Sequence, residues 1–166
     1  MYNTRNPLIF VVIQSPIYSN LVVGFLKSKK YNNVKAFASV QESLAHLNLN
    51  PDIFVSSYEM KEMNGMELMK KVKADHPDTD FFFLSGQNDV EVAVNIIKHG
   101  ATDYIVKNDK ALTKLAKSIE YSINATKSVK VRKGFKIGVI GFFIILFIII
   151  MIILSLAVFF PDDFRF

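Results

Sequence analysis

Three polar residues, Ser57, Ser85 and Lys107, each come directly after a short apolar run of the kind that forms a buried strand. If these runs are parallel strands, their carboxyl ends meet at one edge of a sheet and bring the three side chains together. Two hydroxyls and an ammonium group, with nearby backbone amides, suit the binding of a small anion. The alternative is that Lys107 only hydrogen-bonds a serine or points to solvent.

Nucleophilic and metal chemistry have less support. Ser57 can act as a nucleophile, or accept a phosphate from a kinase, but nucleophilic use needs a base within hydrogen-bond reach. The histidines are all predicted away from the strand ends: His46, His76 and His99. Glu59 and Glu62 can in principle hold a metal, although loop glutamates are usually solvated, and the absence of cysteine excludes thiolate chemistry. No catalytic residue, metal site or cofactor is therefore expected.

Five apolar runs alternate with helical patterns along the chain. The predicted strands are Leu8–Ile13, Val34–Phe37, Ile53–Ser56, Phe81–Leu84 and Asp103–Val106. The first, third and fourth are apolar on both faces, which is typical of central strands in a parallel sheet covered by helices. Strict alternation with short connections predicts an α/β fold, a doubly wound (βα)5 parallel sheet with right-handed crossovers.

The helices are delimited by capping signals. They are predicted over 16–28, from a capping box at Ser39 and Glu42, over 65–75, from Asp89 to a left-handed cap at Gly100, and over 110–125. In the fourth helix we expect Val90, Val94 and Ile97 to face the core. In the fifth, the stripe that faces the core is Leu112, Leu115, Ile119 and Ile123.

Three segments carry a family resemblance: PDIFVSSYEMKEMNGMELMKKVK at the third strand, LSG at the fourth and GATDYIVK at the fifth. With them, from Leu8 to about Ile123, the chain resembles the response-regulator receiver domain. It implies a flavodoxin-like receiver fold. In that family two acidic residues after the first strand hold Mg²⁺, an aspartate after the third accepts the phosphoryl group, and a hydroxyl and a lysine contact the phosphate.

The residues at the family's acidic positions are not acidic here. Ile13 and Gln14 fall at the acidic pair, and Ser57 falls at the phosphoacceptor position. Lys61 and Asn108 stand where the family usually has proline. Because Mg²⁺ and the transferring phosphoryl group need these carboxylates, the sequence predicts a degenerate phosphorylation pocket, that of a pseudo-receiver.

Three family positions are kept. Ser85 matches the hydroxyl, Lys107 the lysine, and Tyr104 the aromatic residue that moves on activation. The predicted pocket is therefore neutral to positive. The resemblance also implies a partner surface formed by the fourth helix, the fifth strand and the fifth helix, with Tyr104 as the partner-face candidate.

The C-terminal part of the chain predicts a membrane anchor. Residues 137–160 contain no charged residue, and as a helix they span roughly 36 Å, enough to cross a hydrocarbon core of about 30 Å. The basic residues that precede this segment are Lys127, Lys130, Arg132, Lys133 and Lys136. By the positive-inside rule the N-terminal domain faces the cytoplasm in a single-pass protein. The resemblance to receiver domains implies a bacterial inner membrane, and a tail-anchored eukaryotic protein is the alternative. Gly134, Gly138 and Gly141 offer a helix-packing motif for a homodimer.

The domain boundaries follow from composition. We expect a receiver-like domain over 1–126, a basic juxtamembrane segment over 127–136, a transmembrane helix over 137–160 and a short tail over 161–166. The net charge of +5 comes mostly from the juxtamembrane cluster, because residues 1–126 hold 14 Lys+Arg and 13 Asp+Glu. This distribution indicates membrane lipid as the partner of the basic residues and argues against nucleic acid.

Together these features favour a membrane-tethered adaptor in signalling, which binds protein partners, including other membrane proteins, without a phosphorylation cycle. One alternative is a sensor that binds a small anion or metabolite in the altered pocket. Another is a structural subunit that acts in a membrane complex through its transmembrane helix.

Overall fold

The computed structural model describes residues 6–159, and it describes side chains for residues 6–126 and 142–152. The chain divides into two compact units, Met1–Asn124 and Ala125–Phe166. The side chains of the predicted basic segment over 127–136, the three glycines of the helix-packing motif and the predicted tail lie outside the described residues.

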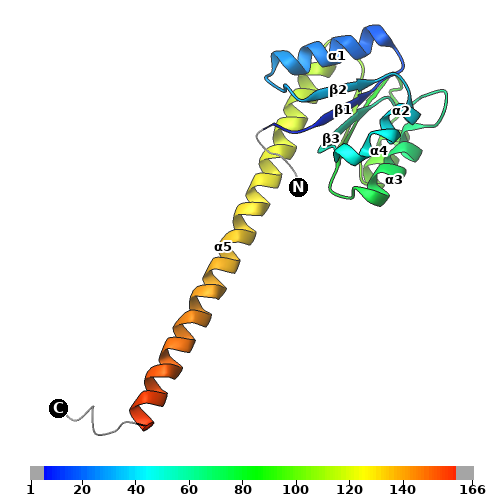
Figure 1. Cartoon of the computed structure of the whole chain (residues 1–166). Helices are drawn as coiled ribbons and strands as arrows, with labels where there is room; N and C mark the ends of the chain where they lie inside the picture. Colours follow the sequence, from blue (N-terminus) through cyan, green and yellow to red (C-terminus); the bar gives the residue numbers. More distant parts are fainter. Residues whose placement is uncertain (1–5, 160–166) are drawn as a thin grey trace. The chain divides into compact units, whose positions relative to one another are not determined.

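The first unit alternates strands and helices as predicted (Figure 1). Its elements are β1 (Ile9–Val12), α1 (Pro16–Ser28), β2 (Val34–Phe37), α2 (Val40–Ala45), the 3₁₀ turn η1 (Leu47–Leu49), β3 (Ile53–Ser56), α3 (Gly65–Asp75), β4 (Asp80–Ser85), α4 (Val90–Lys98), β5 (Asp103–Val106) and the start of α5 (Ala111–Phe159). All strands pair in parallel in the order β2-β1-β3-β4-β5. The doubly wound five-stranded sheet is confirmed.

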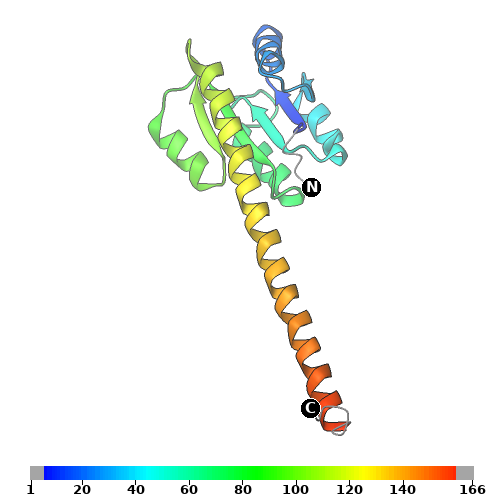
Figure 2. The same cartoon turned by 90° about the vertical axis from the view of Figure 1, so that its left-hand side faces the viewer.

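Helices cover both faces of this sheet (Figures 1 and 2). One face packs against α1 and α5, with Val22, Leu26 and Leu115 fully buried. The other face packs against α2, α3 and α4 and contains five clustered phenylalanines: Phe10, Phe37, Phe54, Phe81 and Phe83. Because every residue of β1 and β3 is buried, these strands can be apolar on both faces.

The predicted caps are confirmed. Ser39 Oγ accepts a hydrogen bond from Glu42 N at 3.1 Å, and Glu42 Oε2 accepts one from Ala38 N at 3.0 Å. Asp89 Oδ1 caps α4, and Gly100 follows that helix with φ of +99°. These local signals fix the helix ends and thereby the lengths of the loops at both edges of the sheet.

The prediction for the buried face of α4 is wrong. Val90, Val94 and Ile97 are 72%, 46% and 44% exposed, whereas the adjacent Ile96 is fully buried. The helix is apolar on two sides, since Val92 and Ala93 are also partly buried beside Ile96. In such a short helix both stripes satisfy the helical period, so the spacing alone does not choose between them.

The fifth helix starts as predicted and continues further. Leu115, Ile119 and Ile123 are buried against the sheet, and Leu112 packs partly against the same cluster. The helical backbone then continues beyond the predicted end at residue 125 and ends at Phe159.

Among the residues whose side chains are described, no helix is both long and apolar enough to cross a membrane. Much of the predicted anchor, 137–160, lies outside those residues. Its described part, 142–152, consists of apolar side chains that are 41–65% exposed.

Candidate functional site

The residues expected to gather at the carboxyl edge of the sheet do so. β1 pairs with β3 up to Val12 and Ser56, and Ser57 N donates to Val12 O at 3.1 Å. β4 pairs with β5 up to Ser85 and Val106, and Lys107 N donates to Ser85 O at 2.8 Å. Ile13, Gln14, Ser57, Ser85 and Lys107 therefore follow strands that end together.

No carboxylate occupies the positions that match the family's acidic pair and phosphoacceptor, as read from the sequence. Ile13 is 2% exposed and belongs to the core cluster that contains Val22 and Leu26, so its side chain is part of the packing. Gln14 is half-buried, and Ser57 is buried. These three positions therefore offer one side-chain amide and one hydroxyl group, which are weaker Mg²⁺ ligands than carboxylates.

Lys107 contacts an aromatic ring. Its Nζ lies 4.6 Å from the centroid of the Tyr18 ring, which is the geometry of a cation–π interaction. Burial lowers the pKa of Lys107 below its ordinary value of 10.5, and the charge of Glu59 partly opposes this shift. The ammonium group thus contacts the face of the Tyr18 ring and interacts electrostatically with Glu59 in the loop after β3.

Ser85 and Tyr104 are tied to the loop after β4. Ser85 Oγ accepts from Gln87 N at 3.0 Å, and Tyr104 Oη donates to Gln87 O at 3.1 Å. Burial raises the pKa of Tyr104 above 10.0, while a hydrogen bond with Ser85 lowers it in part. Tyr104 is only 7% exposed, so this ring is held inward beside Tyr58.

The loop between β3 and α3 is held by contacts that the sequence did not reveal. Gly65 N donates to Tyr58 O at 2.7 Å, and a Cβ at Gly65 would lie 2.5 Å from Phe83 Cε1. Glu62, considered as a metal ligand, instead accepts from Val40 N at 3.1 Å and so helps to cap α2. The described residues include no group of three or more histidines and carboxylates placed to hold a metal ion.

The histidines lie at the other edge of the sheet. His46, His76 and His99 are the C-terminal caps of α2, α3 and α4, and these helices run antiparallel to the strands. The Nδ1 atoms of His46 and His99 hydrogen-bond to the backbone oxygens of Glu42 and Asn95, both at 2.8 Å. In the described structure these three histidines lie at the edge of the sheet opposite Ser57.

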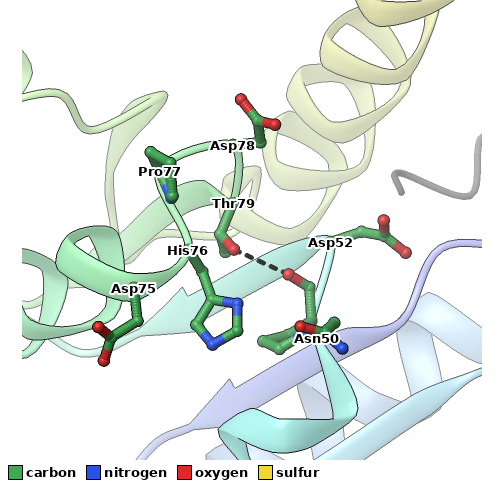
Figure 3. A pocket seen from close by; sticks show the side chains of 8 residues that line it. Asn50, Asp52, Asp75, His76, Pro77, Asp78 and Thr79 are labelled. Atoms are coloured by element: carbon green, nitrogen blue, oxygen red, sulfur yellow. Dashed lines mark hydrogen bonds between the residues drawn. The ribbon is translucent and has the colours of Figure 1, made fainter.

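A polar hollow is present at that other edge (Figure 3). It is lined by Asn50, Pro51, Asp52, Asp75, His76, Pro77, Asp78 and Thr79. Thr79 Oγ1 donates to Pro51 O at 2.8 Å, and Asp52 points away from the hollow and accepts from Leu8 N at 2.9 Å. The first contact joins the loops before β3 and β4, and the second joins the loop before β3 to the residue before β1. The hollow lies away from Ser57, Ser85 and Lys107.

Comparisons with known proteins agree with this fold. The model of the response regulator receiver domain matches residues 9–120, and the chain belongs to that family of two-component signalling domains. It is 32% identical over 106 residues to a putative response regulator NtrX-like of Rickettsia bellii, which covers 61% of this chain and 22% of that protein. It is 32% identical over 57 residues to the regulatory protein LuxO of Vibrio vulnificus, which covers 34% of this chain and 13% of that one.

Solved receiver structures are similar over most of the chain. The signal receiver domain of a putative Luxo repressor protein from Vibrio parahaemolyticus has a TM-score of 0.68 at 17% identity, covering 76% of this chain and 96% of that one. NtrX from Brucella abortus has a TM-score of 0.66 at 25% identity, covering 75% and 29%. The chain spans only 13–22% of the length of the curated relatives described above.

Proposed function

We propose that this receiver domain works without phosphorylation and binds a protein partner while it is tethered to a bacterial inner membrane. The observation that carries the proposal is which residues occupy the carboxyl edge of the sheet. Ile13, Gln14 and Ser57 supply no carboxylate there, and Lys107 lies against Tyr18. A pocket without these acids has neither the Mg²⁺ ligands nor the phosphoacceptor that the family's chemistry requires.

The inward position of Tyr104 supports a domain that needs no phosphate. In the receiver family this aromatic residue moves on activation, as the resemblance implies. Here the Tyr104 hydroxyl donates a hydrogen bond to Gln87 O, and the Tyr104 ring is buried beside Tyr58. This hydrogen bond and the ring packing hold Tyr104 inward, and we propose that the domain stays in the corresponding one of its two conformations.

The partner surface that we propose is the α4 surface, which consists of Val90, Val94 and Ile97. These three side chains are exposed on one side of a helix whose other side is buried. Beside them a mainly apolar hollow is lined by Ala93, Val94, Ile97, Lys98, Asp103 and Tyr104. Tyr104 lines this hollow but is only 7% exposed, so the exposed contact area comes from α4.

A membrane tether is supported by the second unit. The charge-free segment 137–160 lies in the continuous helix α5, and its described residues 142–152 are apolar and exposed. An exposed helix with no polar side is the form that lipid surrounds. The basic residues before the segment orient the first unit toward the cytoplasm.

The first experiment tests independence from phosphorylation. Mg²⁺ with beryllofluoride, a phosphoryl analogue, is added to the full chain in detergent micelles, and amide spectra are recorded by NMR. We expect no shift of the signals of Ser57, Ser85 and Lys107. Saturable shifts at these residues would show a working acceptor site and refute the proposal.

The second experiment tests the α4 surface. Crosslinked partners are recovered from membranes with the intact chain, with V94D/I97D, and with L49D, which changes an exposed apolar residue elsewhere in the same unit. We expect a specific partner to be lost with V94D/I97D and kept with L49D. A partner that survives in V94D/I97D would show that recruitment does not use this surface.

An anion sensor is the second candidate, because Lys107, Ser57 and Ser85 follow neighbouring strands at one edge. A ligand that binds only the folded state raises stability. Inorganic phosphate should then raise Tm in the intact chain and not in K107M. An unchanged Tm at saturating phosphate would exclude phosphate as the ligand.

A further inference from the structure

The first helix, α1, is apolar on its outer side as well as its inner side. Val22 and Leu26 are buried against the sheet, while Ile17 and Leu21 on the opposite side are 85% and 54% exposed. Gly24 continues the exposed stripe, with no atom within 4 Å of the place where a Cβ would lie. The stripe has the i, i+4, i+7 spacing of one helix face.

Charge within the first unit is strongly polarised. Residues 6–41, which form β1, α1 and β2, contain four lysines and no Asp or Glu. Residues 42–126 contain nine Lys and thirteen Asp+Glu, a net charge of −4. Lys27, Lys29 and Lys30 lie at the end of α1, are exposed, and follow directly on the apolar stripe.

The chain leaves the first unit close to these lysines. Lys29 and Lys30 line the same groove as Ile123, and Asn124 is the last residue of that unit. From there the segment 125–136 covers roughly 18 Å as a helix, and at most about 40 Å when fully extended, before the segment proposed to cross the membrane. The basic end of α1 is thus kept within tens of ångströms of the lipid headgroups.

We propose that the outer face of α1, formed by Ile17, Leu21 and Gly24 with Lys27, Lys29 and Lys30, docks on an anionic lipid surface. Apolar side chains beside lysines are what an interface of anionic headgroups and acyl chains binds. The inference rests on the proposed membrane tether, which supplies the high local concentration of lipid. Docking through α1 leaves the α4 surface free, since α1 and α4 cover opposite faces of the sheet.

The test uses the full chain in vesicles. The chain contains no cysteine, so G24C carries a single environment-sensitive fluorophore such as nitrobenzoxadiazole, and N95C on the exposed side of α4 is the matched control. Each is reconstituted in phosphatidylcholine alone and in phosphatidylcholine with phosphatidylglycerol. We expect a blue shift of the G24C label only in the anionic vesicles, and loss of that shift in the background K27E/K29E/K30E.

The outcomes separate docking from anchoring, because flotation of the vesicles reports anchoring directly. A chain that floats with both vesicles while the G24C label stays in water refutes docking and leaves the tether intact. Equal shifts in both lipid compositions, or at both label positions, refute a charge-selective α1 surface. A chain that floats with neither vesicle refutes the tether and the docking together.

Discussion

Ser57 follows β3 and Lys107 follows β5, and these strands end at the same edge of the sheet. We expect S57D alone to gain no Mg²⁺-dependent phosphorylation from acetyl phosphate, because Ile13 and Gln14 supply no metal ligand. The triple variant I13D/Q14D/S57D should bind Mg²⁺, at lower stability, because Ile13 is 2% exposed. Phosphate-affinity gels and Mg²⁺ titrations measure both. Phosphorylation of S57D alone would show that another group holds the metal.

Gly65 and Gly24 form a matched pair for the packing of the loop after β3. A Cβ at Gly65 would lie 2.5 Å from Phe83 Cε1 and 2.7 Å from Ser57 O, whereas one at Gly24 meets nothing within 4 Å. We expect G65A to lower the free energy of unfolding by about 1–3 kcal/mol, and G24A to raise it by about 0.5–1 kcal/mol. Denaturant titrations give both values. Similar effects for the two variants would contradict this packing.

Tyr18 makes a pH-dependent contribution to stability. Burial raises the pKa of its phenol above 10.0, so the folded protein holds this proton more tightly than the unfolded chain does. The resulting stabilisation is complete below about pH 10 and is lost as pH rises through the folded pKa. Lys107, whose pKa is lowered, titrates with the opposite sign. We therefore expect Y18F, which keeps the ring beside Lys107, to lose less stability than wild type in alkaline urea titrations.

The sequence predicted where the site residues lie in the fold, but it did not predict their side-chain contacts. Strand ends placed Ser57, Ser85 and Lys107 at one edge because parallel strands align there. The partner of Lys107 was not predictable, because Tyr18 comes from α1, and no local pattern relates a helix residue to the end of β5. The capping of α2 by Glu62 was missed for the same reason, because this hydrogen bond joins the loop after β3 to the start of α2, which is distant in sequence.

At the scale of elements, the two apolar sides of α4 allow a direct test. Ile96 is fully buried and the adjacent Ile97 is 44% exposed. We expect I96A to lower the free energy of unfolding by about 2–5 kcal/mol, and I97A by less than about 1 kcal/mol. Thermal or urea unfolding of the two variants checks this. The reverse order would mean that the helix is rotated toward the orientation first predicted from the sequence.

Element boundaries followed the local signals closely. α1, α3, β2, β3 and β5 have the predicted bounds, because proline, capping side chains and apolar runs act within a few residues of where they lie. The rotation of α4 was not predictable, because Ile96 and Ile97 are equally apolar and only the sheet chooses between them.

At the scale of the whole molecule, the adaptor and the structural-subunit proposals differ in what residues 137–160 must do. If the segment is only an anchor, replacing it with an unrelated apolar helix of equal length preserves partner recovery through the α4 surface. Crosslinking from membranes measures this, with V94D/I97D as the negative control. A partner lost on the swap, while the chain stays in the membrane, would show that the helix itself is the functional element.

The hydrogen bond from Tyr104 to Gln87 O has a consequence for regulation. A two-state protein carries information only when some ligand binds its states unequally. Under the proposed function, a domain that stays in one state gives an output that depends on the number of copies and on their location. Its control would then lie in synthesis, membrane insertion and degradation, and its signal would last as long as the molecule.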